Sequence, residues 1–395
     1  MTDAPKNIIG SGGGGGSPPP PPQPTRTPDT LHSRQFATFL DLISEGEIEG
    51  FASASKEGRT KGTTAYNNAA LKDVFLNDTP VLKATANSAS PATTDFNFQD
   101  VTFNPRFGTS DQTKVEGIES SSSITAVGVV VTQSSPVTRQ ITNSNVDAAN
   151  ITITFPQIQK ATDKGDLLGS SVSLKIAVQY NSGGFTDVIS DTITGRTADA
   201  YQRDYRINLT GAFPVDIRVT RVTADSSDSS LQDAFQWTSF AEIIDDSNTY
   251  ANSAYASVRL DSMQFQSIPS RKYRIRGIKV RIPGAGANSS GTPTVDGTTG
   301  RIVYPDGYIF NGVMGAAQWC SCPAMVLLDL LLDTRYGFGN HITESSLDLF
   351  SFVTASKFAN TLVDDGFGGQ EARFSCNVNI QSSSEAFDLI NELAG

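Results

Sequence analysis

The middle third of the chain alternates between apolar and polar residues, and this pattern predicts β-strands. From Val172 to Tyr180 every second residue is apolar, with polar residues such as Ser173 between them. The alternation indicates a sheet with one face in a core and the other in solvent. Asn181–Gly184 predicts a tight turn into a second strand at Phe185–Ile193, and therefore a hairpin. Shorter alternating segments surround it at residues 127–131, 151–155, 205–209 and 215–219.

Many short strands separated by turns are typical of an immunoglobulin-like or fibronectin-like β-sandwich, which we assign to residues 96–240. Residues 84–111 are polar and poorly patterned, as expected of a loop that leads into an inserted module. Sandwich domains host many functions, so a lectin-like sugar site is an alternative for this module.

Further strands are predicted on both sides of the sandwich, and we assign residues 34–95 and 241–300 to one β-rich hub domain around it. The segment Lys72–Val81 predicts two short strands that meet at a turn formed by Asn77 and Asp78. A second set of strands is predicted at Phe235–Asp246 and Ser257–Phe265.

One strand carries a basic stripe. In Arg271–Pro283 (RKYRIRGIKVRIP) the apolar residues change parity at Gly277, which predicts a β-bulge there. The cations face either an acidic neighbour or DNA, or solvent, with counter-charges from this acidic protein itself. We take all six as candidate partner-contact residues: Arg271, Lys272, Arg274, Arg276, Lys279 and Arg281.

The last hundred residues change to a helical pattern, and we assign residues 301–395 to an α+β part of the hub. Pro323 suits the first position of a helix that ends at Gly337. A second helix is predicted over Thr343–Leu362, and a third begins at Ser382 with a capping box. Nothing later in the sequence covers its apolar face, so we expect a truncated chain or a contact with another subunit. The predicted fold class is β-rich α+β.

Residues 1–33 form a tail rich in glycine and proline, with runs at Gly12–Gly16 and Pro18–Pro22. Such a composition buries too little surface to offset its ordering entropy. We therefore expect the tail to be disordered or to order only on a partner. The glycine run is a poor phosphate loop, because no strand precedes it and prolines follow it.

Charge restricts the kinds of partner. The chain has 395 residues and a formal net charge of −11. An acidic surface opposes general phosphate binding, yet it suits a duct through which DNA passes without binding. The sequence shows neither an apolar stretch long enough to cross a bilayer nor a secretory signal, so we expect folding in a cytosol.

Candidate catalytic residues are sparse. The two histidines, His32 and His341, leave little for acid–base chemistry at neutral pH, and no nucleophile or zinc-protease motif occurs. The carboxylate pairs Asp245-Asp246 and Asp364-Asp365 lack the spacing of a calcium loop. We therefore expect no enzymatic activity and no cofactor.

The three cysteines, Cys320, Cys322 and Cys376, are too few and odd in number for a disulfide framework. Cys320 and Cys322 also lack the spacing usual in zinc and redox motifs. We expect buried thiols and no metal, with a site that includes His341 as the alternative.

Seven segments occur in an order that resembles a known family. They are Ile43–Gly50 (ISEGEIEG), Phe75–Val81 (FLNDTPV), Val115–Ser122 (VEGIESSS), Trp237–Asp245 (WTSFAEIID), the basic strand, Pro323–Gly339 (PAMVLLDLLLDTRYGFG) and Asp365–Cys376 (DGFGGQEARFSC). Together they resemble the tail-tip attachment protein J family of lambda-like bacteriophages, also called host specificity proteins. The resemblance spans about residues 34–395, and the helix that ends in RYGFG is its most specific part.

The resemblance implies a tail-tip hub with an inserted β-sandwich, in a homotrimer that closes the tail tube and connects it to the receptor-binding fibre region. Its partners would be other tail-tip proteins and the tape-measure protein, with phage DNA passing through the lumen without specific binding. Receptor binding in this family belongs to a far C-terminal region, so we expect no receptor contact in this chain. The expected location is the virion tail tip, with assembly in the host cytoplasm.

Two other functions remain open. The chain could be a free-standing adhesin or carbohydrate-binding sandwich, which glycan binding by residues 110–235 would favour. It could also be a tail-associated peptidoglycan hydrolase, which zymography would detect.

Overall fold

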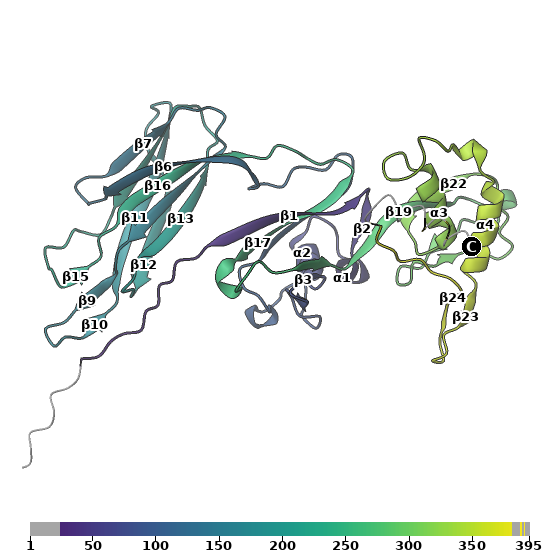
Figure 1. Ribbon diagram of the computed structural model, residues 1–395, viewed down its shortest axis with the longest axis horizontal. Helices are drawn as coiled ribbons and strands as arrows, with labels where there is room; N and C mark the ends of the chain where they lie inside the picture. The colour runs from purple at the N-terminus through teal and green to yellow at the C-terminus, as the bar shows by residue number, and fades with distance from the viewer. Residues whose placement is uncertain (1–23, 381–387, 389–390, 392–395) are drawn as a thin grey trace, which may run out of the picture. The chain divides into compact units, whose positions relative to one another are not determined.

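The computed structural model describes residues 24–380 together with residues 388 and 391 (Figure 1). These residues fold into two compact units. Unit 1 combines the residues up to Ser33 with Ser123–Ile243, and unit 2 combines Arg34–Ser122 with the residues from Ile244 onward. Residues 1–23 of the predicted tail and the start of the third predicted helix at Ser382 lie outside the described residues.

Unit 1 is a sandwich of two four-stranded sheets, with strand orders β12-β11-β14-β7 and β13-β8-β16-β6. Their inner faces enclose a core in which Phe155, Phe235 and Trp237 are at most 1% exposed. A small third sheet has the order β10-β9-β15 (Figure 1). The strands are β6 Glu119–Val130, β7 Val137–Ile141, β8 Ala148–Phe155, β9 Gln159–Ala161, β10 Leu167–Leu168, β11 Ser170–Tyr180, β12 Thr186–Gly195, β13 Tyr201–Asn208, β14 Val215–Arg221, β15 Leu231–Gln232 and β16 Gln236–Asp245.

Strand β11 shows how the alternating pattern becomes structure. Val172, Leu174 and Ile176 are at most 1% exposed, because their shared face points into the core. On the other face Ser173 Oγ lies 2.8 Å from Thr192 Oγ1 of the neighbouring β12. The predicted β11–β12 hairpin is confirmed.

The boundaries of the sandwich differ from those predicted. Residues 96–122 belong to unit 2, because β5 (Thr102–Phe107) pairs with β17 (Ser253–Asp261) and Phe103 is buried in the core of that unit. Phe235–Asp246 was assigned to the second set of strands, but it contains β16, which pairs with β8 inside the sandwich. Alternation shows which face of a strand is buried, and it does not show which sheet the strand joins.

Residues 24–33 contradict the prediction of a disordered tail up to residue 33. They run in extended form along unit 1, and Arg26 forms a parallel β-bridge with Leu167. We call residues 24–33 the strap. Most strap side chains are exposed, as their composition predicts, so backbone hydrogen bonds and one ion pair hold most of the segment, with Leu31 packed against the core.

Unit 2 consists of short sheets and short helices. Its larger sheets have the orders β1-β17-β5, β18-β3-β4 and β2-β19-β22. The predicted turn at Asn77 and Asp78 is confirmed, since both residues have positive φ angles and join β3 to β4. The strands not yet given are β1 Phe36–Glu45, β2 Ile48–Phe51, β3 Val74–Leu76, β4 Thr79–Pro80, β18 Arg271–Tyr273, β19 Ile275–Pro283, β20 Thr294–Val295, β21 Ile302–Val303, β22 Met314–Trp319, β23 Leu362–Asp364 and β24 Gln370–Ala372.

Strand β19 serves two apolar cores of unit 2. Near its start Ile275 packs against the core around Phe51, whereas Val280 and Ile282 belong to the core around Met325. The pairing of β19 with β2 continues through Gly277 without a shift in register, so the predicted bulge there is wrong. The apolar parity changes because the two cores lie on opposite faces of the strand. A register shift in β19 falls further along, between Arg281 and Pro283 in its pairing with β22.

The helices of unit 2 are α1 Ala52–Lys56, α2 Thr64–Ala70, α3 Pro323–Leu332 and α4 Leu349–Ala359. Helix α3 begins at Pro323, as predicted, but it ends at Leu332 and not at Gly337. The second predicted helix, Thr343–Leu362, is shorter than expected. Asp348 caps α4 by accepting a hydrogen bond from Phe350 N, and a 3-10 turn at Glu344–Ser346 precedes it. Across the described residues, no helix has the length and apolarity needed to span a membrane.

Candidate functional site

The six candidate partner-contact cations lie on β18, on β19 and between them, and each has a partner inside unit 2. Arg276 lies over the ring of Trp319, with the guanidinium carbon 4.6 Å from the ring centroid. The other five form ion pairs, with N–O distances of 2.6 Å for Arg271–Asp41, 2.5 Å for Lys272–Asp78, 2.6 Å for Arg274–Asp73, 2.6 Å for Lys279–Glu47 and 2.7 Å for Arg281–Glu344. The chain thus supplies its own counter-charges to this strand.

Asp41 on β1 is held by two side chains of β18. Arg271 donates to both of its oxygens, from Nε at 2.6 Å and from Nη2 at 2.8 Å, and Tyr273 Oη donates at 2.5 Å. Burial acts to raise the pKa of Asp41, but the hydrogen bonds from Arg271 and Tyr273 outweigh it and hold the pKa below its usual value. This cluster joins β1 to β18.

Asp73 is fully buried and holds the start of α1 through Ser53. It accepts hydrogen bonds from Ser53 N at 2.5 Å and from Arg274 Nε at 2.8 Å. Burial raises the pKa of Asp73 above its usual value, because the hydrogen bonds from Ser53 and Arg274 do not offset the loss of water. The basic strand is therefore tied to β1 and to the start of α1 within unit 2. Its contact with a partner stays a prediction.

The RYGFG loop after α3 makes a further connection inside unit 2. Arg335 Nε lies 2.6 Å from a carboxylate oxygen of Glu45 at the end of β1. A Cβ at Gly337 would lie 2.2 Å from the carbonyl oxygen of Leu330, so the loop can fold back on the helix only with glycine there. Tyr336 Oη donates to Asp329 at 2.6 Å, and burial raises the pKa of Asp329 to about 6.

The cysteines fit the expectation of buried thiols at two of three positions. Cys320 and Cys322 are buried, while Cys376 is half-buried. Burial raises the pKa of Cys320 to about 12, which keeps it protonated at neutral pH. No group of three or more His, Cys, Asp or Glu side chains able to hold a metal ion occurs within the part of the chain that the structure describes.

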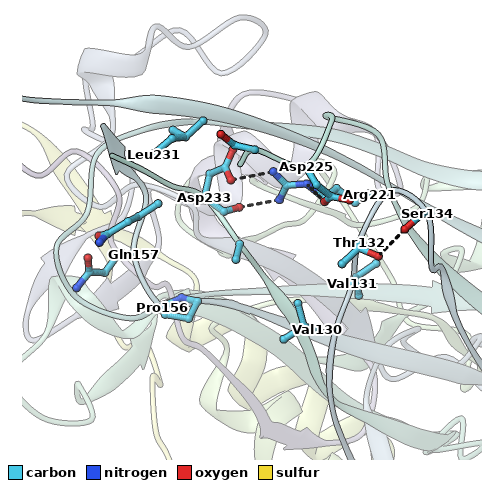
Figure 2. A pocket seen from close by; sticks show the side chains of 13 residues that line it. Val130, Val131, Thr132, Ser134, Pro156, Gln157, Arg221, Asp225, Leu231 and Asp233 are labelled. Atoms are coloured by element: carbon cyan, nitrogen blue, oxygen red, sulfur yellow. Dashed lines mark hydrogen bonds and ion pairs between the residues drawn. The ribbon is translucent and has the colours of Figure 1, made fainter. Parts of the chain in front are cut away.

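A cavity of about 600 Å³ opens on the sandwich (Figure 2). Its wall combines apolar side chains such as Val130 and Leu231 with polar ones such as Gln157 and Ser134. Every residue that lines the cavity belongs to unit 1, so the basic strand contributes nothing to its wall.

Arg221 in the wall of this cavity is a charged residue that is only 2% exposed. Its Nη1 donates to the backbone oxygen of Asp233 at 2.7 Å, and its Nη2 pairs with the carboxylate of that residue at 2.9 Å. Its Nε lies 3.1 Å from Asp225 Oδ1 (Figure 2). The two carboxylates therefore neutralise the cation, which ties the loop that carries Asp225 to the segment between β15 and β16.

Sequence reasoning missed Arg221 and a second buried arginine, Arg196. A signal for Arg221 exists, because it continues the inward-facing positions Val215, Ile217 and Val219 of β14. An arginine at the next inward position has to find a carboxylate in the interior. For Arg196 the sequence offers no such signal, since its partner Asp29 lies 167 residues away.

Comparisons with known proteins agree with the resemblance of the segments. The family model "Tip attachment protein J, FNIII-A domain" matches residues 121–246. A tip attachment protein J of Escherichia phage SECphi4 is 30% identical over 94% of this chain, and one of Escherichia phage SECphi27 is 31% identical over 82%. A solved structure named "CBM4 structure and function" covers 33% of this chain and 77% of its own, at 11% identity and a TM-score of 0.16, which supports no conclusion.

The matched regions amount to 30% and 25% of the two curated relatives, so this chain spans less than a third of their length. Similarity nevertheless extends through both units of this chain. The chain is thus a relative of the phage tip attachment proteins J, and its residues 121–246 are an FNIII-A domain of that family.

Proposed function

We propose that the chain is a structural part of a phage tail tip, in the hub that closes the tail tube and connects it to the receptor-binding fibre region. In this role it acts in host attachment and DNA delivery and has no catalytic activity of its own. The observation that carries the proposal is the similarity to tip attachment proteins J over 94% of the chain. A homotrimer with other tail-tip proteins and the tape-measure protein as neighbours is the proposed assembly, formed in the host cytoplasm.

The surface of unit 2 supports a scaffold that packs against neighbours. Strand β1 lies at the edge of its sheet, where backbone groups are open to a further strand. Phe36, Leu40 and Leu42 alternate along its outer face and are 37%, 38% and 64% exposed. An apolar edge strand of this length is uncommon on an isolated soluble protein and fits a surface that assembly covers.

Immunogold labelling tests the location. Antibodies raised against the chain should label the tail end that is distal to the head on intact virions. Labelling of the capsid, or none on virions whose tails are otherwise complete, would contradict the proposal. Sedimentation of the purified chain with its tail-tip neighbours should give a trimer-sized species, and a chain that stays monomeric with all of them would exclude the homotrimer.

Carbohydrate binding by the sandwich is the second candidate, and the cavity beside Arg221 favours it. A bacterial glycan array probed with the whole chain tests this function. Binding that is lost on Gln157→Ala would support a sugar site in the cavity, with Gln202→Ala outside the cavity as the matched control. Equal binding by both variants would exclude the cavity as the sugar site. No binding by the unchanged chain would exclude carbohydrate binding to the arrayed glycans.

A further inference from the structure

The strap lies in a surface of the sandwich that is shaped to receive it. Thr27 N donates to the backbone oxygen of Leu167 at 2.9 Å, and Leu167 N donates to that of Thr25 at 3.0 Å. Further along, Thr30 N donates to the backbone oxygen of Arg196 at 2.9 Å. The strap therefore binds at two places, the start of β10 and the end of β12, in the manner of a peptide that adds to a sheet edge.

The surface under the strap leaves room for nothing larger than hydrogen at Gly195. A Cβ there would lie 2.5 Å from Thr30 Oγ1 and 2.8 Å from Leu31 Cγ. Leu31 in turn packs against the core of the sandwich. Backbone, side chains and the glycine thus form a groove, which we define as Asp166–Leu167 together with Gly195–Arg196.

Arg196 is the charged floor of this groove. The residue is 2% exposed, and its Nη1 donates to Thr27 O at 2.8 Å and pairs with Asp29 Oδ1 at 2.5 Å. Its Nη2 reaches Gln159 Oε1 at 3.3 Å. The two closest acceptors of this buried cation, one of which is its counter-charge Asp29, come from the strap. A buried cation without a counter-charge is strongly unfavourable, so the groove requires an acidic occupant.

We propose that this groove is a binding site for an extended peptide of the type Thr-x-Thr-Pro-Asp-Thr-Leu, and that the chain fills it with its own residues 25–31. Arg196 reads the carboxylate of Asp29, and Pro28 keeps the peptide extended before it binds, which lowers the ordering cost. The FNIII-A family match begins at residue 121, so the site joins that domain to a segment far outside it. This inference stands independently of the proposed tail-tip function.

A designed disulfide in the full-length chain tests where the strap lies. Arg26 and Leu167 are bridge partners, and the three native cysteines all lie in unit 2. The variant Arg26→Cys with Leu167→Cys should form a cross-link under mild oxidation and run as a monomer on a non-reducing gel. A covalent dimer would show that a second copy supplies the strap and would overturn its own-chain occupancy. A failure to cross-link, with both thiols still free, would overturn the groove itself.

Specificity is tested in the same cross-linking variant. Asp29→Asn removes the charge that pairs with Arg196. In a thiol redox buffer, the ratio of cross-linked to uncross-linked chain should therefore fall by about tenfold. The matched control is Asp199→Asn. The carboxylate of Asp199 is exposed and forms no hydrogen bond or ion pair with the strap, so this substitution should leave the cross-linked fraction unchanged. An equal cross-linked fraction in the cross-linking variant alone, with Asp29→Asn and with Asp199→Asn would refute recognition of Asp29 by Arg196.

Discussion

Removing the carboxylate of Asp41 should destabilise unit 2 strongly, whereas removing the neighbouring surface cation Lys272 should not. Asp41→Asn keeps the shape of the side chain but loses the charge that accepts two hydrogen bonds from Arg271 and one from Tyr273. Hydrogen bonds to charged groups contribute about 1.5–3 kcal/mol each, and breaking a buried ion pair costs about 3–5 kcal/mol. The side chains of Asp41 and Arg271 are 20% and 19% exposed, so the lower end, about 3 kcal/mol, applies.

The control cation, Lys272, lies on the same strand as Arg271. Lys272 and Asp78 are 64% and 73% exposed, and an ion pair in that setting contributes about 0–1 kcal/mol. Lys272→Ala should therefore leave the free energy of unfolding nearly unchanged. Comparing the two substitutions separates an internal structural role of the basic strand from a general effect of its charge.

Urea unfolding followed by tryptophan fluorescence measures both effects. The chain has two tryptophans, Trp237 in unit 1 and Trp319 in unit 2, so a Trp237→Phe background leaves Trp319 as the reporter. A double-mutant cycle with Arg271→Met should give a coupling energy above about 1 kcal/mol with Asp41. The reasoning fails if Asp41→Asn costs no more than Lys272→Ala, or if the cycle shows no coupling.

Further predictions concern ionisation, thiol reactivity and an exposed ring. The pKa of about 6 for Asp329 lies above its unfolded value, so the folded state binds the extra proton and loses up to about 3 kcal/mol of stability as pH rises from 4 to 6. Asp329→Asn should abolish this dependence of the unfolding free energy on pH in urea melts, and an unchanged dependence would refute the prediction. Iodoacetamide at pH 8 should label half-buried Cys376 before buried Cys320, whose thiol pKa is about 12, and mass spectrometry that finds the reverse order would contradict this burial. Phe367 at the β23–β24 turn is 96% exposed, so Phe367→Ser should change the melting temperature by less than about 1 °C, and a larger drop would show that the ring is packed in solution.

The sequence predicted those elements whose signal is local. The β11–β12 hairpin, the Asn77-Asp78 turn and the start of α3 at Pro323 are all found where the pattern placed them. Each depends on residues close together in the chain, namely alternation, turn formers or a first-turn proline. Local patterns of this kind determine what an element is.

Other features depend on distant partners and were therefore missed. The parity change in β19 was interpreted as a bulge, because a single strand gives no sign that it has two cores to serve. Arginine is usually a surface residue, but Arg196 is buried because Asp29 of the strap pairs with it. The sequence marks the six cations of the basic strand as candidate partner contacts, and only the fold shows that Asp41, Asp73 and three further carboxylates pair with five of them.

Because β19 contributes to both cores, we expect unit 2 to unfold as one cooperative unit. If the side chains around Met325 came apart, β19 would lose the apolar cover on one face and with it the support for its pairing to β2, on which the packing around Phe51 depends. Neither half of the unit is then stable without the other, and calorimetry should record one melting transition for both.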